Sequence, residues 1–355
     1  MAKRKTNMIK YIIKRILMMV PMLFLVLSFS WVLSHMMAVS PATNAILSDP
    51  DPDVLKAELE RIGWYDPWYV QLINYYKRFF IGDWGTSYNI QKDRPVFDFI
   101  LEIFPRTIEL MIIPIILSPI IAVKLGVSSA SHKDESRDIF IRALAIIGAG
   151  FPIFWIATLL QLFFGLYLDI FTLGSLDLPV FFANSPGLPY PAPSGEFETG
   201  FRIIDSFLYN DQIYLWDTLI HLFIPAICIT FVSLAGVTRQ TRSSMLDVLD
   251  QDYIRTARAK GVLEKDIINK HALRNSLLPT SNLIIGGTAN ALLGSFFIEI
   301  TFVYRGFGYY MVYSIFEGDY NLINGLLVFA TIIILSGNLV ADVMYTIIDP
   351  RITYT

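Results

Sequence analysis

The stretch DYIRTARAKGVLEKDIINKHALRNSLLP, residues 252–279, decides which fold the sequence predicts. It lies between two apolar segments that are each long enough to cross a bilayer. Together with Arg239 and Arg242 it carries eight of the 28 basic residues of the chain. A short basic segment that joins two membrane spans is expected on the cytoplasmic side. The chain is therefore predicted to be an integral membrane protein with a cytoplasmic loop at this position.

The pattern within the stretch predicts two short helices separated by a turn. Ile254 and Ala257 lie on one side of the first helical pattern, and basic residues are interleaved with them. Gly261 interrupts the run, and a second helical pattern leads to Leu278 and Pro279 at the start of the next span. Two helices joined in this way fit a groove on a soluble partner.

The composition supports a membrane protein without a metal or disulfide framework. Hydrophobic residues make up 54% of the 355 residues and charged residues 17%, and the mean hydropathy is +0.51. The one cysteine, Cys228, lies in an apolar segment, which excludes an internal disulfide. Four histidines are scattered without the spacing of metal ligands. We expect neither a bound metal nor a cofactor.

Apolar segments long enough to span a bilayer predict an all-α, six-span transmembrane helical bundle with extracytoplasmic insertions. The six segments are residues 11–36, 104–127, 139–168, 217–238, 277–303 and 322–346. The first could instead be a cleaved signal peptide. However, it has no small-residue cleavage site, and Met22 to Leu33 continues it to full length, so a retained span is favoured.

The charges of the connecting segments predict the orientation of the bundle. Basic residues gather in the N-terminal segment 1–10 and the start of the first span, in the connection 124–142 and in the loop 239–276. Acidic residues gather in segments 37–103 and 169–216. The positive-inside rule then assigns the basic segments to the cytoplasm. With six spans, both the N-terminus and the C-terminal segment 347–355 are expected there.

The two acidic segments differ in character. Segment 37–103 is dense in tryptophan and tyrosine and includes a helical pattern at Val70–Phe80. Its aromatic residues fit a bilayer interface, and they would also fit a surface that meets a docking protein. Segment 169–216 is rich in proline, which predicts an extended loop. That loop could cap an outer vestibule, bind an external protein or cover a neighbouring subunit.

Ionisable residues in the predicted spans lie near the span ends, at Arg106, Glu109, Glu299 and Asp342. Charges are tolerated there, so a structural role is favoured over a substrate contact. No charge lies at mid-membrane, which disfavours a proton-coupled carrier or an ion pump. Prolines in the predicted spans predict kinks. Small residues of the third span, such as Gly148, and of the fifth span predict close helix packing, and they could equally line a pathway.

Catalytic motifs are absent from the sequence. It contains no phosphate-binding GxxxxGK[ST], no HExxH and no GxSxG. We therefore expect a protein that is not an enzyme and that does not itself bind ATP. We also expect no nucleic acid partner.

Several motifs together resemble the ATP-binding-cassette importer permeases of the dipeptide/oligopeptide/nickel branch, and in particular their B-type subunit. In the basic loop the matching residues are Thr256-Ala257, Gly261 and Leu277-Leu278-Pro279. Importers in general have Glu-Ala-Ala where this loop has Arg255-Thr256-Ala257. The gap from Gly261 to Pro279 is also longer than the gap in importers in general. This departure fits the dipeptide/oligopeptide/nickel branch. Further matching pieces are the first span, GDWGTSY at 82–88, FPRTIEL at 104–110, GFPIFW at 150–155 and DPRITY at 349–354.

The resemblance implies a type I importer permease fold and a set of partners. These are a second homologous permease subunit, two ATP-binding-cassette ATPase subunits, an extracytoplasmic solute-binding protein and the lipid membrane. It implies an ATPase-docking function for the basic loop. The predicted docking residues are Asp252, Tyr253, Arg255, Thr256, Ala257, Arg258, Ala259, Lys260, Gly261, Leu278 and Pro279. Fifth-span residues predicted to line the pathway are Thr288, Asn290 and Ser295.

The resemblance also implies the cargo, with alternatives. Peptides are favoured, and nickel or another chelated metal is the alternative within the branch. Outside the branch, a secondary transporter or channel would require polar residues at mid-span and internal symmetry, and a membrane-embedded enzyme would require paired ionisable groups at matching depth. Neither pattern is seen in the sequence.

Overall fold

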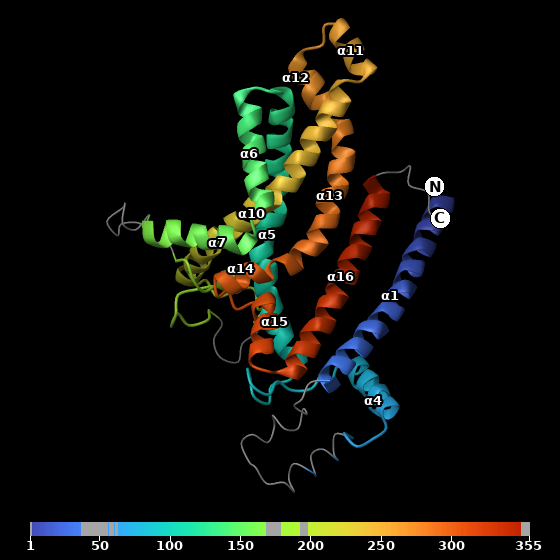
Figure 1. The fold of residues 1–355 in the computed structure, drawn as a ribbon, viewed down its shortest axis with the longest axis vertical. Helices are drawn as coiled ribbons and strands as arrows, with labels where there is room; N and C mark the ends of the chain where they lie inside the picture. Colours follow the sequence, from blue (N-terminus) through green and yellow to red (C-terminus); the bar gives the residue numbers. More distant parts are fainter. Residues whose placement is uncertain are drawn as a thin grey trace. The chain divides into compact units, whose positions relative to one another are not determined.

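The protein is all-helical over the residues that the structure, a computed structural model, describes (Figure 1). These are residues 2–36, 56, 60, 63–167, 179–191 and 198–348, without the side chains of 2–10, 34, 36, 288–294 and 346–348. Among them the only β contact is an isolated antiparallel bridge between Thr86 and Pro95. The described chain divides into two compact units, one formed by residues 1–105 and 306–339 and the other by residues 106–305 and 340–353. Helices α5 (Val96–Ser131) and α16 (Tyr320–Ile348) contribute residues to both.

The first unit combines α1 (Ala2–Met36), α4 (Trp68–Phe80), α15 (Phe307–Phe316), α5 up to Pro105 and α16 up to Leu339. Its core is aromatic, with the rings of Phe104, Phe307 and Phe329 in mutual contact. Gly325 of α16 allows the close approach of α5, because a Cβ there would collide with Val96. The hydroxyl of Ser30 on α1 donates to Asn324 on α16 at 2.7 Å.

The GDWGTSY element, residues 82–88, is a structured turn of this unit. Gly82 and Gly85 adopt φ values of +84° and +79°, which only glycine adopts without strain. The carboxylate of Asp319, which is fully buried, accepts hydrogen bonds from the Ser87 hydroxyl and from the backbone amides of Tyr88, Asn89 and Ile90. One buried charge therefore organises the segment that follows the turn.

The second unit is built around the 38-residue helix α10 (Gln212–Leu249), which packs against α6 (Ser136–Gly150), α7 (Ile153–Leu162), α9 (Arg202–Leu208) and α13 (Leu273–Gly294). A π-helical turn, η1 (Phe163–Tyr167), extends α7, and α14 (Phe296–Thr301) follows α13. Small residues set the helix spacing, as predicted. A Cβ at Gly126 would collide with Thr241, and one at Gly148 would lie 3.2 Å from the Phe231 carbonyl oxygen.

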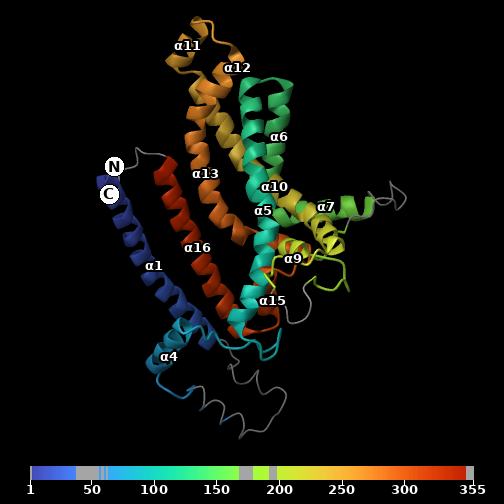
Figure 2. The ribbon, with the colours of Figure 1, turned by 180° about the vertical axis from the view of Figure 1, so that it is seen from behind.

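The helices α6 and α7 meet at an angle of 108° (Figures 1 and 2). The break falls at Phe151-Pro152, because proline has no amide hydrogen for the ladder and disfavours a helical residue before it. The sequence predicted a kink at this position, and in the structure the helix ends there and the chain bends by 108°.

Four described helices are long and apolar enough to cross a membrane, or five if the bent pair α6–α7 is one span. The four are Tyr11–Leu33, Val96–Ser131, Gln212–Leu249 and Tyr320–Tyr345. Helices α1, α5, α10 and α16 run beyond the predicted apolar segments, and α13 begins before its segment. Helix α10 continues past residue 238 to Leu249 because no glycine or proline lies between Gly236 and Gly261. Arg239 and Arg242 therefore lie on α10 rather than in a loop.

The proline-rich segment is attached to the second unit by buried polar contacts over its described residues 179–191 and 198–211. Glu109 of α5 accepts a hydrogen bond from the first turn of α9, at the amide of Ile203 (2.7 Å). Asp205 accepts from the amides of Thr199 and Gly200 and from the hydroxyl of Tyr190. Arg106 donates to the carbonyl oxygen of Arg305. Glu109 and Arg106 thus have structural contacts, as predicted.

The contact at Asp319 generates a test. Replacing Asp319 with Asn removes the charge that four donors share. Hydrogen bonds to a charged group contribute roughly 1.5–3 kcal/mol, so the amides of residues 88–90 should exchange hydrogen about tenfold to a hundredfold faster. Hydrogen-exchange mass spectrometry measures this. Asp83→Asn, a change at a half-exposed carboxylate in the same turn, should leave these three amides unaltered, and equal effects of the two variants would contradict the assignment.

Candidate functional site

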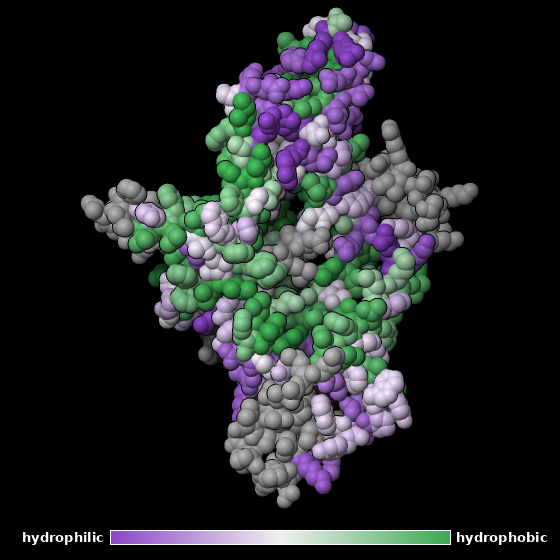
Figure 3. Space-filling view, in the orientation of Figure 1, coloured by the Kyte–Doolittle hydropathy of each residue, from purple (hydrophilic) through white to green (hydrophobic). Residues whose placement is uncertain are grey.

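The predicted helix–turn–helix of the basic loop is present and begins where α10 ends. We call residues 250–272 the elbow. It contains α11 (Asp252–Ala259), α12 (Glu264–Asp266) and the π-helical turn η2 (Ile267–Ala272), which leads directly into α13. Figure 3 shows hydrophilic side chains gathered around α11 and α12.

Gly261 ends α11 in a defined capping geometry. Its φ is +77°, and its amide donates to the carbonyl oxygen of Arg258 at 3.0 Å. The amide of Val262 donates to the carbonyl oxygen of Ala257 at 3.2 Å. This pair of bonds is the Schellman motif, which places a left-handed residue after the helix and explains why glycine stands there. The turn folds the chain back toward α10.

A small apolar core holds the elbow against the ends of α5 and α10. Ile254 of α11 and Ile267 of η2 are fully buried and pack with Met245 of α10 and Ala130 of α5. Ala257 is half-buried against the same cluster. Fully burying an isoleucine side chain contributes about 1.5–3 kcal/mol. The elbow is consequently a packed extension of α10 and α5.

The predicted cationic residues of α11 are paired within the elbow. Arg255 contacts Asp252 at 3.2 Å, and Arg258 contacts Glu264 at 2.8 Å. The hydrogen bond from Arg258 lowers the pKa of the Glu264 carboxyl below its ordinary value. The Tyr253 hydroxyl accepts from the side chain of Asn275 on α13 at 2.8 Å. Arg255 and Arg258 would have to exchange these contacts to bind acidic groups of a partner.

The exposed side of the elbow combines small and apolar residues. Ala259, Lys260 and Gly261 are exposed, and a Cβ at Gly261 would meet nothing within 4 Å. Leu263 is 72% exposed, beside the buried Ile254 and Ile267. Leu263 was not predicted as a docking residue, because periodicity alone does not separate it from its half-buried neighbour Val262.

A buried ion pair lies next to the elbow core. Asp138, in the first turn of α6, is fully buried and accepts two hydrogen bonds from the guanidinium of Arg242 on α10, both at 2.8 Å. It also accepts from the hydroxyl of Ser129 on α5 and from the amide of Asp134. The pair joins three helices at the ends from which the elbow extends. The pairing of these two residues was not predicted, because they are 104 positions apart in the sequence.

Of the remaining predicted residues, Thr256 is exposed on α11 and its hydroxyl donates to the carbonyl oxygen of Asp252 at 2.9 Å, and the others lie on α13 or at its C-terminal cap. Leu278 and Pro279 are in the second turn of α13, which begins at Leu273 and thus precedes the predicted start of the fifth span. Ser295 is buried, and its hydroxyl donates to Glu299, which also accepts from Thr107 of α5. The backbones of Thr288 and Asn290 are helical, and their side chains are outside the described set.

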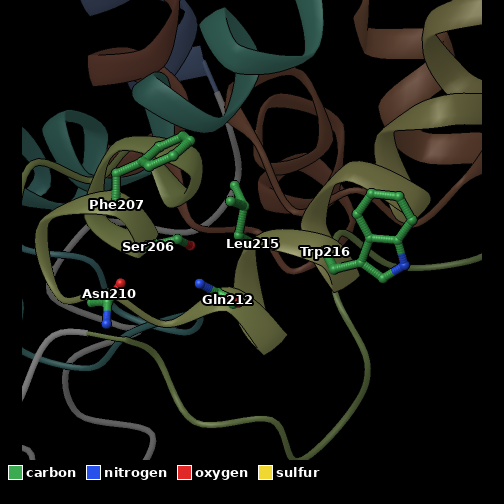
Figure 4. A pocket seen from close by; sticks show the side chains of 6 residues that line it. All are labelled: Ser206, Phe207, Asn210, Gln212, Leu215 and Trp216. Atoms are coloured by element: carbon green, nitrogen blue, oxygen red, sulfur yellow. The ribbon is translucent and has the colours of Figure 1, made fainter.

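Two cavities lie in the second unit. One, of about 430 Å³, sits at the junction of α9 and α10 (Figure 4). It is lined by Ser206, Phe207, Asn210, Gln212, Leu215 and Trp216. The other, of about 270 Å³, lies between α5, α10 and α13, and Gly236 and Gly287 leave open space on its walls. Among the residues that the structure describes, no charged side chain lines either cavity. Within the described part of the chain, no three His, Cys, Asp or Glu side chains gather to form a metal site.

Residues 122–354, which include the elbow and the Asp138–Arg242 pair, match the family model described as "Binding-protein-dependent transport system inner membrane component". The chain belongs to this family. It is therefore a multi-pass permease of the cell membrane, a non-catalytic component that works with a binding protein and other subunits of an ATP-binding-cassette transport system.

Relatives of this permease align with almost its whole length. It is 35% identical over 351 residues to the oligopeptide transport system permease protein AppB of Bacillus subtilis (strain 168), covering 98% of this chain and 100% of that protein. It is 34% identical over 348 residues to the dipeptide transport system permease protein DppB of Alkalihalophilus pseudofirmus, covering 98% and 100%. The corresponding values for the dipeptide transport system permease protein DppB of Escherichia coli (strain K12) are 30%, 98% and 99%.

The Asp138–Arg242 pair generates a second test. Arg242→Ala removes the two guanidinium hydrogen bonds from the buried Asp138 carboxylate and leaves only the half-exposed Arg142 as a nearby positive charge, which should cost about 3–5 kcal/mol. The double variant Asp138→Ala, Arg242→Ala removes both charges and should be less destabilised than Arg242→Ala alone. Thermal unfolding of the purified permease measures the difference. Arg142→Ala is the matched control, because Arg142 is half-exposed and lies 3.7 Å from Asp138. An Arg242→Ala variant as stable as Arg142→Ala would contradict the assignment.

Proposed function

We propose that the chain is the subunit that forms half of the translocation pathway of an ATP-driven peptide importer. The observation that carries this proposal is the end-to-end similarity to permeases named for oligopeptide and dipeptide transport. Substrate would be delivered by an extracytoplasmic solute-binding protein, and a second homologous permease would complete the pathway. Nickel or another chelated metal is the alternative cargo.

For the membrane topology we propose six spans. Four are the long apolar helices, the bent pair α6–α7 is another, and α13 with α14 is the sixth. Both termini and the elbow would then be cytoplasmic. The basic residues near the N-terminus, in the α5–α6 connection and around the elbow support this orientation.

The elbow would be the docking site of an ATPase subunit. Its exposed side offers Ala259 and Gly261, which permit close backbone approach, and Leu263 as an apolar anchor. Ion pairs at the rim of such a contact set specificity and approach rate more than affinity. Lys260, which is exposed, would serve in this way, as would Arg255 and Arg258 after exchange of their present partners.

The mechanism would be alternating access driven from the elbow. Closure of the two ATPases would move the elbow, and the change must favour one orientation of the spans through contacts that differ between the two states. The packing of Ile254 and Ile267 on Met245 and Ala130 makes the elbow continuous with α10 and α5. The Asp138–Arg242 pair extends that connection to α6. A displacement of the elbow would therefore be passed to three helices at once.

A bulky residue on the exposed side of the elbow tests the docking assignment. Ala259→Trp should abolish co-purification of the ATPase and ATP-dependent uptake, because the indole would occupy the contact surface. Ala259 is preferred over Ala257, which packs in the elbow core, and over Gly261, whose φ strains any side chain.

Asn269→Trp is the matched control, because Asn269 is an exposed residue of η2 outside the predicted docking set. Retention of the ATPase by Asn269→Trp and its loss by Ala259→Trp is the expected pair of results. An assembled, active Ala259→Trp transporter would contradict docking at α11.

Reconstitution tests the cargo. The permease pair, its ATPases and its binding protein in proteoliposomes should accumulate labelled di- or oligopeptides only when ATP is present. Accumulation of a chelated nickel ion without peptide would move the assignment to the metal branch. Peptide uptake that continues without the ATPases would indicate a secondary transporter instead.

A further inference from the structure

Helix α4 folds back along the last turns of the apolar stretch of α1. His35 of α1 contacts Gln71 at 2.9 Å, and the Ser28 hydroxyl contacts the Tyr76 hydroxyl at 2.6 Å. The ring of Phe24 contacts Phe80 at the other end of α4. As the α1 positions descend from 35 to 24, the α4 positions ascend, so the two helices run in opposite directions. In Figures 1 and 2, α4 lies at the end of α1 remote from the N-terminus.

These contacts fix the depth of α4. Tyr11–Leu33 is the stretch of α1 apolar enough to cross a membrane, so residues 24–33 are its final turns. The Gln71 end of α4, beside His35, therefore lies at the boundary between the hydrocarbon and the water, and its Phe80 end, beside Phe24, lies within the adjoining half of the hydrocarbon. This conclusion depends only on α1 being a membrane span and is independent of the cargo and of the elbow.

When the residues of α4 are placed around the helix axis at 100° per residue, the surface of the helix divides into three sectors. One sector, with Gln71, Tyr75 and Tyr76, faces α1 and is half-buried. A second sector is apolar yet exposed, and its members are Tyr69 (53% exposed), Ile73 (49%) and Phe80 (58%). The third sector is polar and exposed, and consists of Asn74, Lys77 and Arg78.

The exposed apolar sector adjoins the sector that packs on α1, and Phe80 continues the surface of Phe24. The surface of α1 around it is also apolar and exposed, with Leu25 at 68% and Phe29 at 55%. The apolar flank of α4 is thus continuous with the exposed apolar face of a membrane-spanning helix. Such a face is covered by hydrocarbon in a bilayer.

The polar sector excludes deep insertion. Asn74 and Lys77 are exposed, and Arg78 forms an ion pair with Asp83 at 2.9 Å, with both side chains about half-exposed. Charged groups at this density are costly in hydrocarbon but favourable among headgroups, where an ammonium such as that of Lys77 meets phosphate. Trp68 and Tyr65, 66% and 64% exposed, are residue types enriched at membrane interfaces.

We propose that α4 is an interfacial helix inclined from the headgroup layer at Gln71 into the adjoining acyl region at Phe80, with Tyr69, Ile73 and Phe80 facing acyl chains and Asn74 and Lys77 facing water and phosphate. It is the geometry expected of an amphipathic helix at a membrane surface. The bilayer would thereby fix the end of α1 and the start of the segment that contains the GDWGTSY turn.

Spin labels at neighbouring positions of the complete transporter in lipid nanodiscs test this proposal. The sole cysteine, Cys228, is buried and is first replaced by serine. Nitroxides are then attached to Ile73→Cys and, as the matched control one residue away, to Asn74→Cys. Power-saturation measurements compare collisions with oxygen, which concentrates in lipid, and with a water-soluble nickel chelate.

The ratio of oxygen to nickel collisions should be severalfold higher at position 73 than at position 74. Equal ratios with frequent nickel collisions would mean that both faces of α4 are in water and would overturn the proposal. A label at position 73 that neither reagent reaches would mean that protein covers the flank, as a binding protein or a second permease would, and would overturn it as well. A label at position 74 shielded from nickel would place the whole helix inside protein or hydrocarbon, with the same consequence.

Discussion

The ion pair between Asp138 and Arg242 joins α5, α6 and α10 at the ends from which the elbow extends. Its carboxylate is fully buried and is held by two hydrogen bonds from the guanidinium, one from Ser129 and one from the backbone at Asp134. A buried charge is tolerated only where donors of the chain replace its water. The three helices cannot separate at this end without exposing that charge to water or removing its hydrogen-bond donors. The elbow core, with Ile254, Ile267 and Met245, is built directly on this junction.

The same constraint explains how segments outside the apolar helices are held. Asp319 organises residues 87–90 in the first unit, and Asp205 organises residues 199–200 in the second. Glu109 meets the first turn of α9. Asp319 and Asp205 each accept several hydrogen bonds from a nearby segment, whereas Glu109 accepts one, from the Ile203 amide. These three acidic residues are therefore the points at which the connecting segments are attached.

Local sequence signals predicted the local structure well. Gly261 predicted the turn between two helices because a left-handed residue after a helix strongly favours glycine. Val70–Phe80 predicted the helix α4, and Pro152 predicted a kink where the structure has a break between α6 and α7. Long-range contacts could not be predicted in this way. Nothing in the spacing of Asp138 and Arg242 connects them, and the exposure of Leu263 depends on how the turn at Gly261 folds the chain back. The length of α10 was missed because the apolar pattern ends near residue 238 while helix-compatible residues continue.

The elbow is continuous with the spans, and the chain has no motif that would bind ATP. The central claim is that this elbow lies in the cytoplasm, where an ATPase can reach it. Labelling of a single cysteine at Leu263 with a membrane-impermeant maleimide, in a Cys228→Ser background, tests it most directly. Labelling in inside-out vesicles and protection in intact cells or spheroplasts is the predicted result. Labelling from the outside of intact cells or spheroplasts would contradict the account.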